Sequence, residues 1–221
     1  MANRMIRVIT IEREYGAGGG VIAQKVAESL RWKLWDQLLT CEIARIADCE
    51  QSEVASREER IDPLYYRLVK SIMRGSFEGN TNVRGLHCLD ADSIQRITRQ
   101  ITERAAQEGN CVIVGRGSQH HLRDRSDTLR IFLFAPREDK IRRLATEGIP
   151  RSEAEQLVDT VDKERADFIG KYFNMEWPNR SLYHALLNTA SGENVVITTI
   201  LDLKEKMDKV EAAPTVFQVS K

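Results

Sequence analysis

A run of glycines directly after the first apolar segment constrains the fold of this chain more than any other feature. Residues 5–11 (MIRVITI) are rich in β-branched side chains and predict a strand buried on both faces. The glycines follow at 16–20 (GAGGG), and an amphipathic helix is expected to begin there and run to about Leu30. Such a junction aims backbone N–H groups and the positive end of a helix dipole at one place. We therefore expect a phosphate to bind at Gly16, Ala17, Gly18, Gly19, Gly20 and Val21.

The glycine loop departs from the full phosphate-loop pattern G-x-x-x-x-G-K-[ST]. Arg13 stands at the first glycine, Gly19 at the lysine, and Val21 where a magnesium-binding hydroxyl is expected. The alternative reading is a tight turn that simply needs glycine. On the phosphate-binding reading, the backbone cradle remains, its two polar side chains are missing, and Arg13 is expected to supply the positive charge that Gly19 lacks.

Strand-like and helix-like segments alternate along the rest of the chain, which predicts a parallel sheet with helices on both faces. Further strands are predicted at 32–35, 111–114, 129–134 and 182–187. Helices are predicted at 52–74, 92–108, from Pro136 onward, and at 152–173 with Ser152 and Glu155 as a capping box. Residues 77–90 are expected to form a loop, and 195–200 (VVITTI) fit either a strand or a helix.

Composition narrows the class of protein. The chain has 221 residues, with 33 basic and 33 acidic ones, so its formal net charge is zero. This balance argues against a protein that binds bulk nucleic acid or an acidic membrane. No apolar run approaches the length of a membrane span, and the first residues do not resemble a signal peptide. We therefore expect a cytoplasmic protein.

The cysteines and histidines do not indicate a metal centre. The four cysteines form no CxxC pair and have no histidine at zinc-finger spacing, and Cys111 is expected to be a small core residue. His120 and His121 are adjacent, and we expect a surface or loop pair rather than metal ligands.

Five segments together resemble the cytidylate kinase-like family, a group of divergent P-loop relatives of the nucleoside monophosphate kinases. They are EREYGAGGGVIAQKVAESL, VIVGRGSQHHL, LRIFLFAPREDKIRRL, VDKERADFIGKYF and LYHALLNT, and they occur in the family's order. The resemblance runs from about residue 6 to about residue 210. It implies one three-layer α/β/α P-loop kinase-like domain over 1–221, with a parallel five-stranded sheet. It also implies a monophosphate-binding lobe at about 37–90 and a lid at about 150–180.

The resemblance implies roles for three cations. Arg116, in the GRG segment after the strand at 111–114, matches an arginine that binds the monophosphate, although it also fits a surface loop. Lys163 and Arg165 match the lid that closes on the transferred phosphoryl group, but they equally fit a solvated helix face. Together with Arg13, these residues are the expected catalytic set.

Other positions have weaker assignments. Asp36 is expected either to bind the substrate or to cap the next helix. One of Arg142 and Arg143 could reach the site. Because Val114 and Gly115 stand where an acidic magnesium ligand often lies, Mg²⁺ is expected to be held mainly by nucleotide phosphates and water.

The expected activity is transfer of the ATP γ-phosphoryl group to CMP or dCMP, with small nucleotides as partners and no nucleic acid. Two alternatives stay open. The first is a nucleotide-binding protein on a kinase fold with lost or weak transferase activity, which the missing loop lysine favours. The second is a small-molecule kinase whose acceptor is not a nucleotide. The sequence does not decide the oligomeric state.

Overall fold

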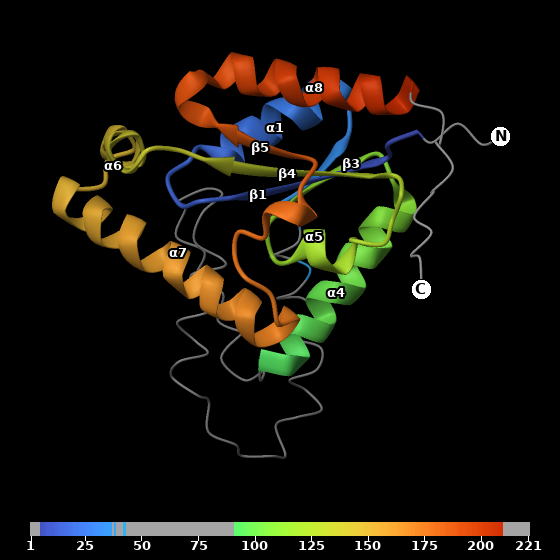
Figure 1. Ribbon diagram of the computed structural model, residues 1–221, viewed down its shortest axis with the longest axis horizontal. Coiled ribbons are helices and arrows are strands. Elements are labelled where there is room, and N and C mark those ends of the chain that lie inside the picture. Colours follow the sequence, from blue (N-terminus) through green and yellow to red (C-terminus); the bar gives the residue numbers. More distant parts are fainter. Residues whose placement is uncertain (1–4, 37, 39–41, 43–90, 210–221) are drawn as a thin grey trace, which may run out of the picture.

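The protein is built around one sheet of five parallel strands in the order β2-β3-β1-β4-β5 (Figure 1). The computed structural model describes residues 5–36, 38, 42 and 91–209. The strands are β1 (Val8–Arg13), β2 (Lys33–Trp35), β3 (Cys111–Val114), β4 (Thr128–Phe134) and β5 (Ala185–Asn188). The predicted parallel five-stranded sheet is confirmed.

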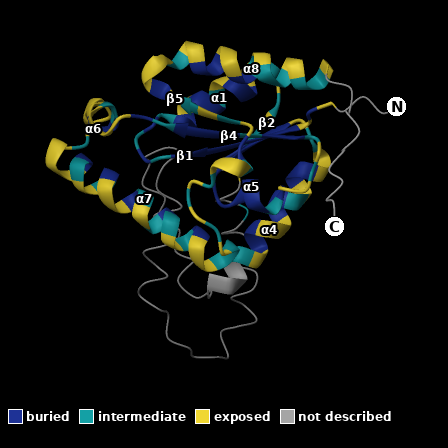
Figure 2. Cartoon of the chain, in the orientation of Figure 1, coloured by how far each residue is buried: buried dark blue, intermediate teal, exposed yellow. Residues whose placement is uncertain are grey.

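Helices cover both faces of this sheet (Figure 1). They are α1 (Gly19–Leu30), α4 (Ala91–Glu108), α5 (Ser118–His121), α6 (Arg137–Thr146), α7 (Arg151–Phe173) and α8 (Glu193–Lys209), with 3-10 turns η2 (Arg180–Leu182) and η3 (Thr189–Ser191). Helices α1 and α8 pack on one face around Ile9, Ile11 and Ile131. Helices α4 and α5 pack on the other face around Val8 and Ile113. Figure 2 shows the strands as the most buried part of the molecule, which is expected of a sheet covered on both sides.

Strand β1 lies at the centre of the sheet and brings distant segments together. It pairs with β3 on one side and with β4 on the other, and all six of its residues are buried. Its residue Ile11 stands opposite Val114 of β3, so both strands end at the same edge. Ligands of open α/β sheets bind beyond the carboxyl ends of the strands. The segments that follow β1 and β3 therefore meet where a ligand is expected.

The structure corrects several predicted boundaries. Strand β1 ends at Arg13 rather than at residue 11, while Met5 lies before it and is exposed. Helix α7 begins at Arg151 after Pro150, without a side-chain cap, so the predicted capping box at Ser152 does not form. The N-cap position is instead Pro150, whose side chain has no oxygen to accept a hydrogen bond from the first turn.

The remaining predictions along the chain have mixed outcomes. The last strand, β5, begins three residues later than expected, and 195–200 belong to α8. In that helix Val196, Ile197 and Ile200 face the core, a spacing that suits a helix better than a strand. The predicted helix at 52–74, the loop at 77–90 and nearly all of the lobe at 37–90 lie outside the described residues. In the described part of the chain, no helix is long and apolar enough to cross a membrane.

Candidate functional site

The glycine loop connects β1 to α1 in the conformation that a phosphate cradle requires. Gly16 and Gly18 have φ values of +73° and +74°, and Gly18 is the N-cap of α1. Ala17 donates its backbone N–H to the Glu14 carbonyl at 3.3 Å, which closes the turn. The first N–H groups of a helix have no acceptor within the helix and are available to an anion. The loop thus presents its backbone donors at the edge of the sheet where β1 ends.

The placement of Val21 at the hydroxyl of the phosphate-loop pattern is wrong by one residue, because the hydroxyl directly follows the lysine. The helix begins at Gly19, and the residue directly after it, where the pattern has its hydroxyl, is Gly20. Val21, to which the sequence analysis gave that place, is 40% exposed. The hydroxyl of the pattern is therefore missing at position 20, where this chain has a buried glycine.

Arg13 occupies the space that a lysine at position 19 would need. A Cβ atom on Gly19 would lie 2.7 Å from Arg13 Cγ and 2.9 Å from Arg13 Cβ. A Cβ on Gly115, at the end of β3, would lie 2.0 Å from Nη1 of the same arginine. Two glycines, 96 residues apart in the chain, thus leave room for one buried arginine side chain: Gly19 for its aliphatic part and Gly115 for its guanidinium group. Arg13 and a lysine at position 19 are sterically incompatible.

Arg116 follows β3 in a strained segment. Gly115, Arg116 and Gly117 have successive φ values of +64°, +59° and +71°. A left-handed conformation costs a non-glycine residue about 1–2 kcal/mol. Such strain is typical of ligand sites, where it fixes the direction of a side chain. Arg116 is nevertheless only 9% exposed, so it is not the ordinary surface arginine of the alternative reading.

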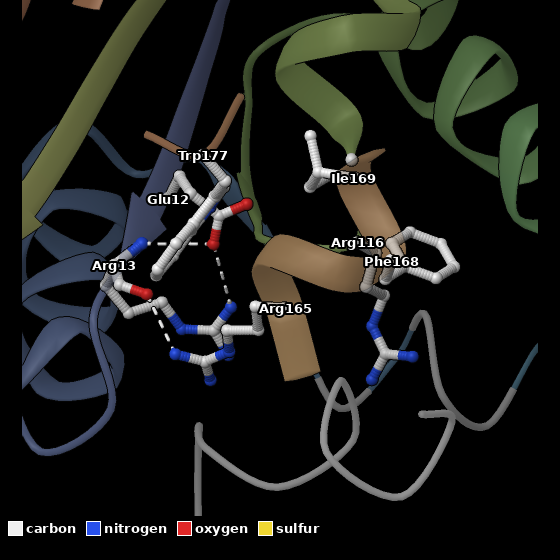
Figure 3. A pocket seen from close by; sticks show the side chains of 8 residues that line it. Glu12, Arg13, Arg116, Arg165, Phe168, Ile169 and Trp177 are labelled. Atoms are coloured by element: carbon white, nitrogen blue, oxygen red, sulfur yellow. Dashed lines mark hydrogen bonds and ion pairs between the residues drawn. The ribbon is translucent and has the colours of Figure 1, made fainter. Parts of the chain in front are cut away.

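Three of the predicted cations meet in one pocket at the ends of β1 and β3 (Figure 3). Its lining residues are Glu12, Arg13, Arg116, Gly117, Arg165, Phe168, Ile169 and Trp177. Arg13 and Arg165 are each about 4% exposed, and Arg165 donates from Nη1 to the Arg13 carbonyl at 2.8 Å. Burial, together with the charge of Arg13, lowers the pKa of Arg165 to about 10, so it stays charged at neutral pH. A cluster of buried guanidinium groups is suited to bind an anion.

Glu12 is the acidic member of this pocket, and the sequence analysis gave it no role. Its Oε1 accepts the backbone N–H of Arg13 at 3.1 Å and lies 3.6 Å from Arg13 Nη1. Its Oε2 accepts from Gln119 Nε2 at 2.8 Å. Glu12 was overlooked because β1 was predicted to end at residue 11, which placed Glu12 in a loop. The available signal was that the segment EREYG continues the strand into the site.

Helix α7 divides the charged segment 162–165 between its two sides. Asp162 and Arg165 turn inward and form an ion pair at 3.3 Å, while Lys163 is exposed. Residues three apart share one helix face, whereas Lys163 projects away from that face. The solvated-face reading describes Lys163, and the lid role of this segment stays a prediction. The structure places Arg165 in the pocket and Lys163 on the outside of the helix.

Arg143 contacts the outer side of the glycine loop. Its Nη1 donates to the Gly16 carbonyl at 2.6 Å, and Nη2 lies 3.5 Å from Thr189 Oγ1. A Cβ on Gly18 would lie 3.2 Å from its guanidinium carbon. The neighbouring Arg142 is exposed and pairs with Asp139. Of the two candidate arginines, Arg143 is therefore the one that reaches the loop, and helical spacing alone did not distinguish them.

Asp36 follows β2 and is only 4% exposed. The residues after it belong mostly to 37–90, outside the described part of the chain, so its predicted substrate-binding role stays a prediction. Cys111 is buried, as expected, and burial raises its thiol pKa to about 12. Among residues 5–36, 38, 42 and 91–209, no three His, Cys, Asp or Glu side chains gather as metal ligands.

The prediction that His120 and His121 form a surface or loop pair is wrong. Both belong to α5, and His120 is 5% exposed. The ring of His120 stacks on Phe173 at 4.5 Å, and His121 contacts the same ring edge-on at 5.0 Å. Gly117 allows this packing, because a Cβ there would lie 2.6 Å from Phe173 Cζ. The two histidines thus anchor the end of α7 beside the pocket.

Acidification should weaken the fold through these two rings. Burial lowers the pKa of each to about 4 from an ordinary value of 6.5. The neutral rings therefore stabilise the fold fully above pH 6.5, and this contribution is lost as the pH falls toward 4. Between pH 7 and pH 5 we expect a loss of about 1–2 kcal/mol per ring in the free energy of unfolding. Denaturant titrations of the wild type and a His120→Gln/His121→Gln variant test this, and the variant should show a flatter pH profile.

Comparisons with known proteins agree with this architecture. A sequence model of the cytidylate kinase-like family matches residues 8–191. An uncharacterized protein from Eubacterium ventriosum is 18% identical with a TM-score of 0.61, over 90% of this chain and 98% of that one. A gluconokinase from Sinorhizobium meliloti is 14% identical with a TM-score of 0.53, over 93% and 95% of the two chains. No curated protein sequence matches significantly. At these identities the structural likeness shows the fold, a three-layer α/β/α kinase fold.

Proposed function

This chain belongs to the cytidylate kinase-like family, and we propose that it transfers the γ-phosphoryl group of ATP to CMP or dCMP. The observation that carries this proposal is the cluster of Arg13, Arg116 and Arg165 beside the glycine loop. Phosphoryl transfer is catalysed by positioning and by stabilising the charge on the transferred group. A buried set of guanidinium groups next to a phosphate cradle supplies both.

In the proposed reaction each part of the site has a distinct task. The backbone N–H groups that begin α1 bind the ATP phosphates, and Arg143 holds the outer side of that loop through Gly16. Arg13 takes the place of the missing loop lysine, because its side chain fills the space beside Gly19. Arg165 binds the transferred group from α7. Arg116, directed by its strained backbone, binds the phosphate of the acceptor.

The residues present suit ATP and Mg²⁺ to different degrees. The left-handed Gly16 and Gly18 and the start of α1 fit a polyphosphate chain. For the metal, Glu12 is engaged by Gln119 and Arg13, and Gly20 offers no hydroxyl. Mg²⁺ commonly keeps several water ligands and binds through nucleotide phosphates. Bound Mg²⁺ would neutralise part of the charge on the nucleotide phosphates.

A second candidate is a nucleotide-binding protein without efficient transfer. Gly19 and Gly20 favour it, because they replace the two polar side chains of the phosphate-loop pattern. Loss of one well-placed charge contact lowers a rate by about 10²- to 10³-fold. The kinase proposal therefore requires that Arg13 compensate for the missing lysine.

A third candidate is a kinase with an acceptor other than a nucleotide. The gluconokinase from Sinorhizobium meliloti shares this fold, which hosts more than one acceptor class. The observation that separates the candidates is which acceptor raises the rate of ADP formation.

Calorimetric titration with ATP·Mg²⁺, CMP and dCMP, followed by a coupled assay for ADP, tests the proposal. Binding of both partners with CMP- or dCMP-dependent turnover is the expected result. Tight ATP binding without turnover would favour the second candidate, a nucleotide-binding protein without efficient transfer. If ATP bound but turnover required a sugar acid such as gluconate instead of CMP or dCMP, the third candidate, a kinase with a non-nucleotide acceptor, would be favoured.

An Arg116→Ala variant should separate acceptor binding from ATP binding. Loss of a charge-assisted contact to the acceptor phosphate should raise the KM for CMP by about 10-fold or more. The KM for ATP should change by less than about 3-fold, because the glycine loop is intact. Steady-state kinetics with each substrate varied in turn measure both values. Arg123→Ala is the control, since Arg123 is exposed and pairs with the exposed Asp124. An equal effect on both substrates would contradict the role assigned to Arg116.

A further inference from the structure

One carboxylate, that of Asp162, links helix α7 to the glycine loop and to helix α6. Its Oδ1 accepts the backbone N–H of Tyr15 at 2.8 Å and lies 3.3 Å from Arg165 Nη1. Its Oδ2 accepts from Lys140 Nζ at 3.2 Å. The side chain of Asp162 is only 17% exposed, so these contacts are made largely away from water.

The contacts of Asp162 extend to three successive residues where β1 enters the loop. Lys140 also donates to Glu14 Oε2 at 3.0 Å, and its side chain is 9% exposed. Arg165 also donates to the carbonyl of Arg13 at 2.8 Å. The backbone of Arg13, the side chain of Glu14 and the backbone of Tyr15 are thus all held by one group of ionised side chains.

The network formed by these side chains has equal numbers of acidic and basic members, and an apolar cluster involves the same segments of the chain. Three acidic and three basic side chains take part, namely Glu12, Glu14, Asp162, Arg13, Lys140 and Arg165. Removal of one partner from a buried ionic group leaves an uncompensated charge, which is more costly than removal of both. A separate apolar cluster joins the same segments and includes Tyr15, Ile141, Leu144 and Val158. That cluster can keep α6, α7 and the loop together when a single charge is removed.

We propose that Asp162 is a positioning residue that holds the glycine loop and Arg165 in a fixed relative position, so that α7 moves with the loop. This coupling between α7 and the glycine loop goes beyond the proposed function. Its expected effect on kcat rests on that function. The coupling itself is a property of the Tyr15 N–H, the Lys140 ammonium group and the Arg165 guanidinium group. It can therefore be measured without turnover.

Asp162→Ala is the variant that tests this coupling, and Asp159→Asn is its matched control. Asp159 lies on the same helix but is exposed, and it pairs with Arg137 at 2.8 Å on the surface. In Asp162→Ala the exchange of the Tyr15 amide hydrogen should quicken by about 10-fold or more, because its acceptor is lost. The Kd for ATP·Mg²⁺ should rise by about 10-fold. Asp159→Asn should leave both values within about 2-fold of the wild type.

A double variant separates positioning from simple charge balance. Lys140→Met/Asp162→Ala removes both members of the ion pair on Oδ2. The thermal midpoint lost in Asp162→Ala should return only in part, because Glu14, which is 25% exposed, also loses its contact with Lys140. The fast exchange of Tyr15 and the weakened ATP binding should persist, since neither depends on neutralising Lys140. Recovery of both in the double variant would show that Asp162 serves only to balance Lys140, and would overturn the proposal.

The outcomes distinguish this inference from the proposed function. Unchanged Tyr15 exchange in folded Asp162→Ala overturns the coupling, whatever the wild-type activity. If the wild type binds ATP·Mg²⁺ but shows no turnover, the proposed function fails, while exchange and ATP affinity still decide the coupling. If the wild type turns over CMP, kcat should fall by about 10-fold or more in Asp162→Ala. An Asp162→Glu variant should then recover more of kcat than Asp162→Asn, because it keeps the charge.

Discussion

An Arg13→Met variant should transfer phosphoryl groups about 10²- to 10³-fold more slowly than the wild type. The reason is that Arg13 is the side chain that lies where the missing loop lysine would extend, between Gly19 and Gly115. Removal of a single preorganised charge contact at a transferring group has an effect of this size. The variant should also be less stable, because the buried Glu12 loses an ion-pair partner. The measurement is kcat in the coupled assay, with circular dichroism and thermal unfolding as checks on folding.

Arg7→Met is the matched control for this variant. Arg7 precedes the same strand at its opposite end, is exposed, and bonds to the Glu108 carbonyl at 3.0 Å. It should keep wild-type kcat within about 2-fold, since surface substitutions of this kind have small effects. A folded Arg13→Met protein with wild-type kcat would remove Arg13 from the catalytic set.

A lysine placed at position 19 provides a sharper test of the same idea. Gly19→Lys alone should be destabilised and inactive, because its Cβ would lie 2.7 Å from Arg13 Cγ. Arg13→Gly/Gly19→Lys removes the obstacle and restores both the first glycine and the lysine of the phosphate-loop pattern. This double variant should be at least about 10-fold more active than Arg13→Gly. If it is no better, the space beside Gly19 is not where the charge is needed.

The second large effect is expected at Gly16. Gly16→Val should weaken ATP·Mg²⁺ binding by about 100-fold or more, since a β-branched residue is strongly disfavoured at the φ of +73°. Its Cβ would also lie 3.0 Å from Lys140 Cβ and 3.2 Å from the Lys140 carbonyl oxygen. The loop would have to shift away from α6, and its N–H groups would no longer converge. Calorimetry gives the Kd.

Gly148→Val controls for backbone strain alone. Gly148 also has a left-handed φ, of +94°, but a Cβ there would meet nothing within 4 Å. Both variants should lose stability, by at least about 1–2 kcal/mol, but Gly148→Val should bind ATP·Mg²⁺ as the wild type does. Unaltered ATP affinity in a folded Gly16→Val protein would exclude the glycine loop as the phosphate site.

Local patterns predicted the central strands and several of the helices, but not α5 or the helical state of 195–200. The β-branched run before the glycines became β1, the apolar residues Ile97, Ile101 and Ala105 became the inner face of α4, and Gly109 ended that helix. These features depend on residues close in sequence, since periodicity and positive φ values are local properties. The predicted phosphate cradle at the start of α1 has the conformation expected of it for the same reason.

The arrangement of charges was decided by contacts between distant segments. Nothing within residues 162–165 shows which side chains turn inward. The structure settles it because Asp162 meets Tyr15, 147 residues away, and Arg165 meets Arg13, 152 residues away. Likewise, α6 follows β4, the sheet neighbour of β1, and this places the helix beside the loop. On that helix Arg143 faces the loop, while Arg142 is exposed and pairs with Asp139.

The sequence by itself thus determined a strand, a glycine loop and a helix within a parallel sheet, because these follow from backbone preference and hydrophobic period. It did not determine that Arg13 fills the space beside Gly19, since the room for its guanidinium group depends on the distant Gly115, which follows β3. Nor did it determine that the histidines of α5 stack on Phe173 of α7. Only tertiary structure decides which side chains share a buried volume, because the free energy of a buried charge or ring depends on the partners that surround it.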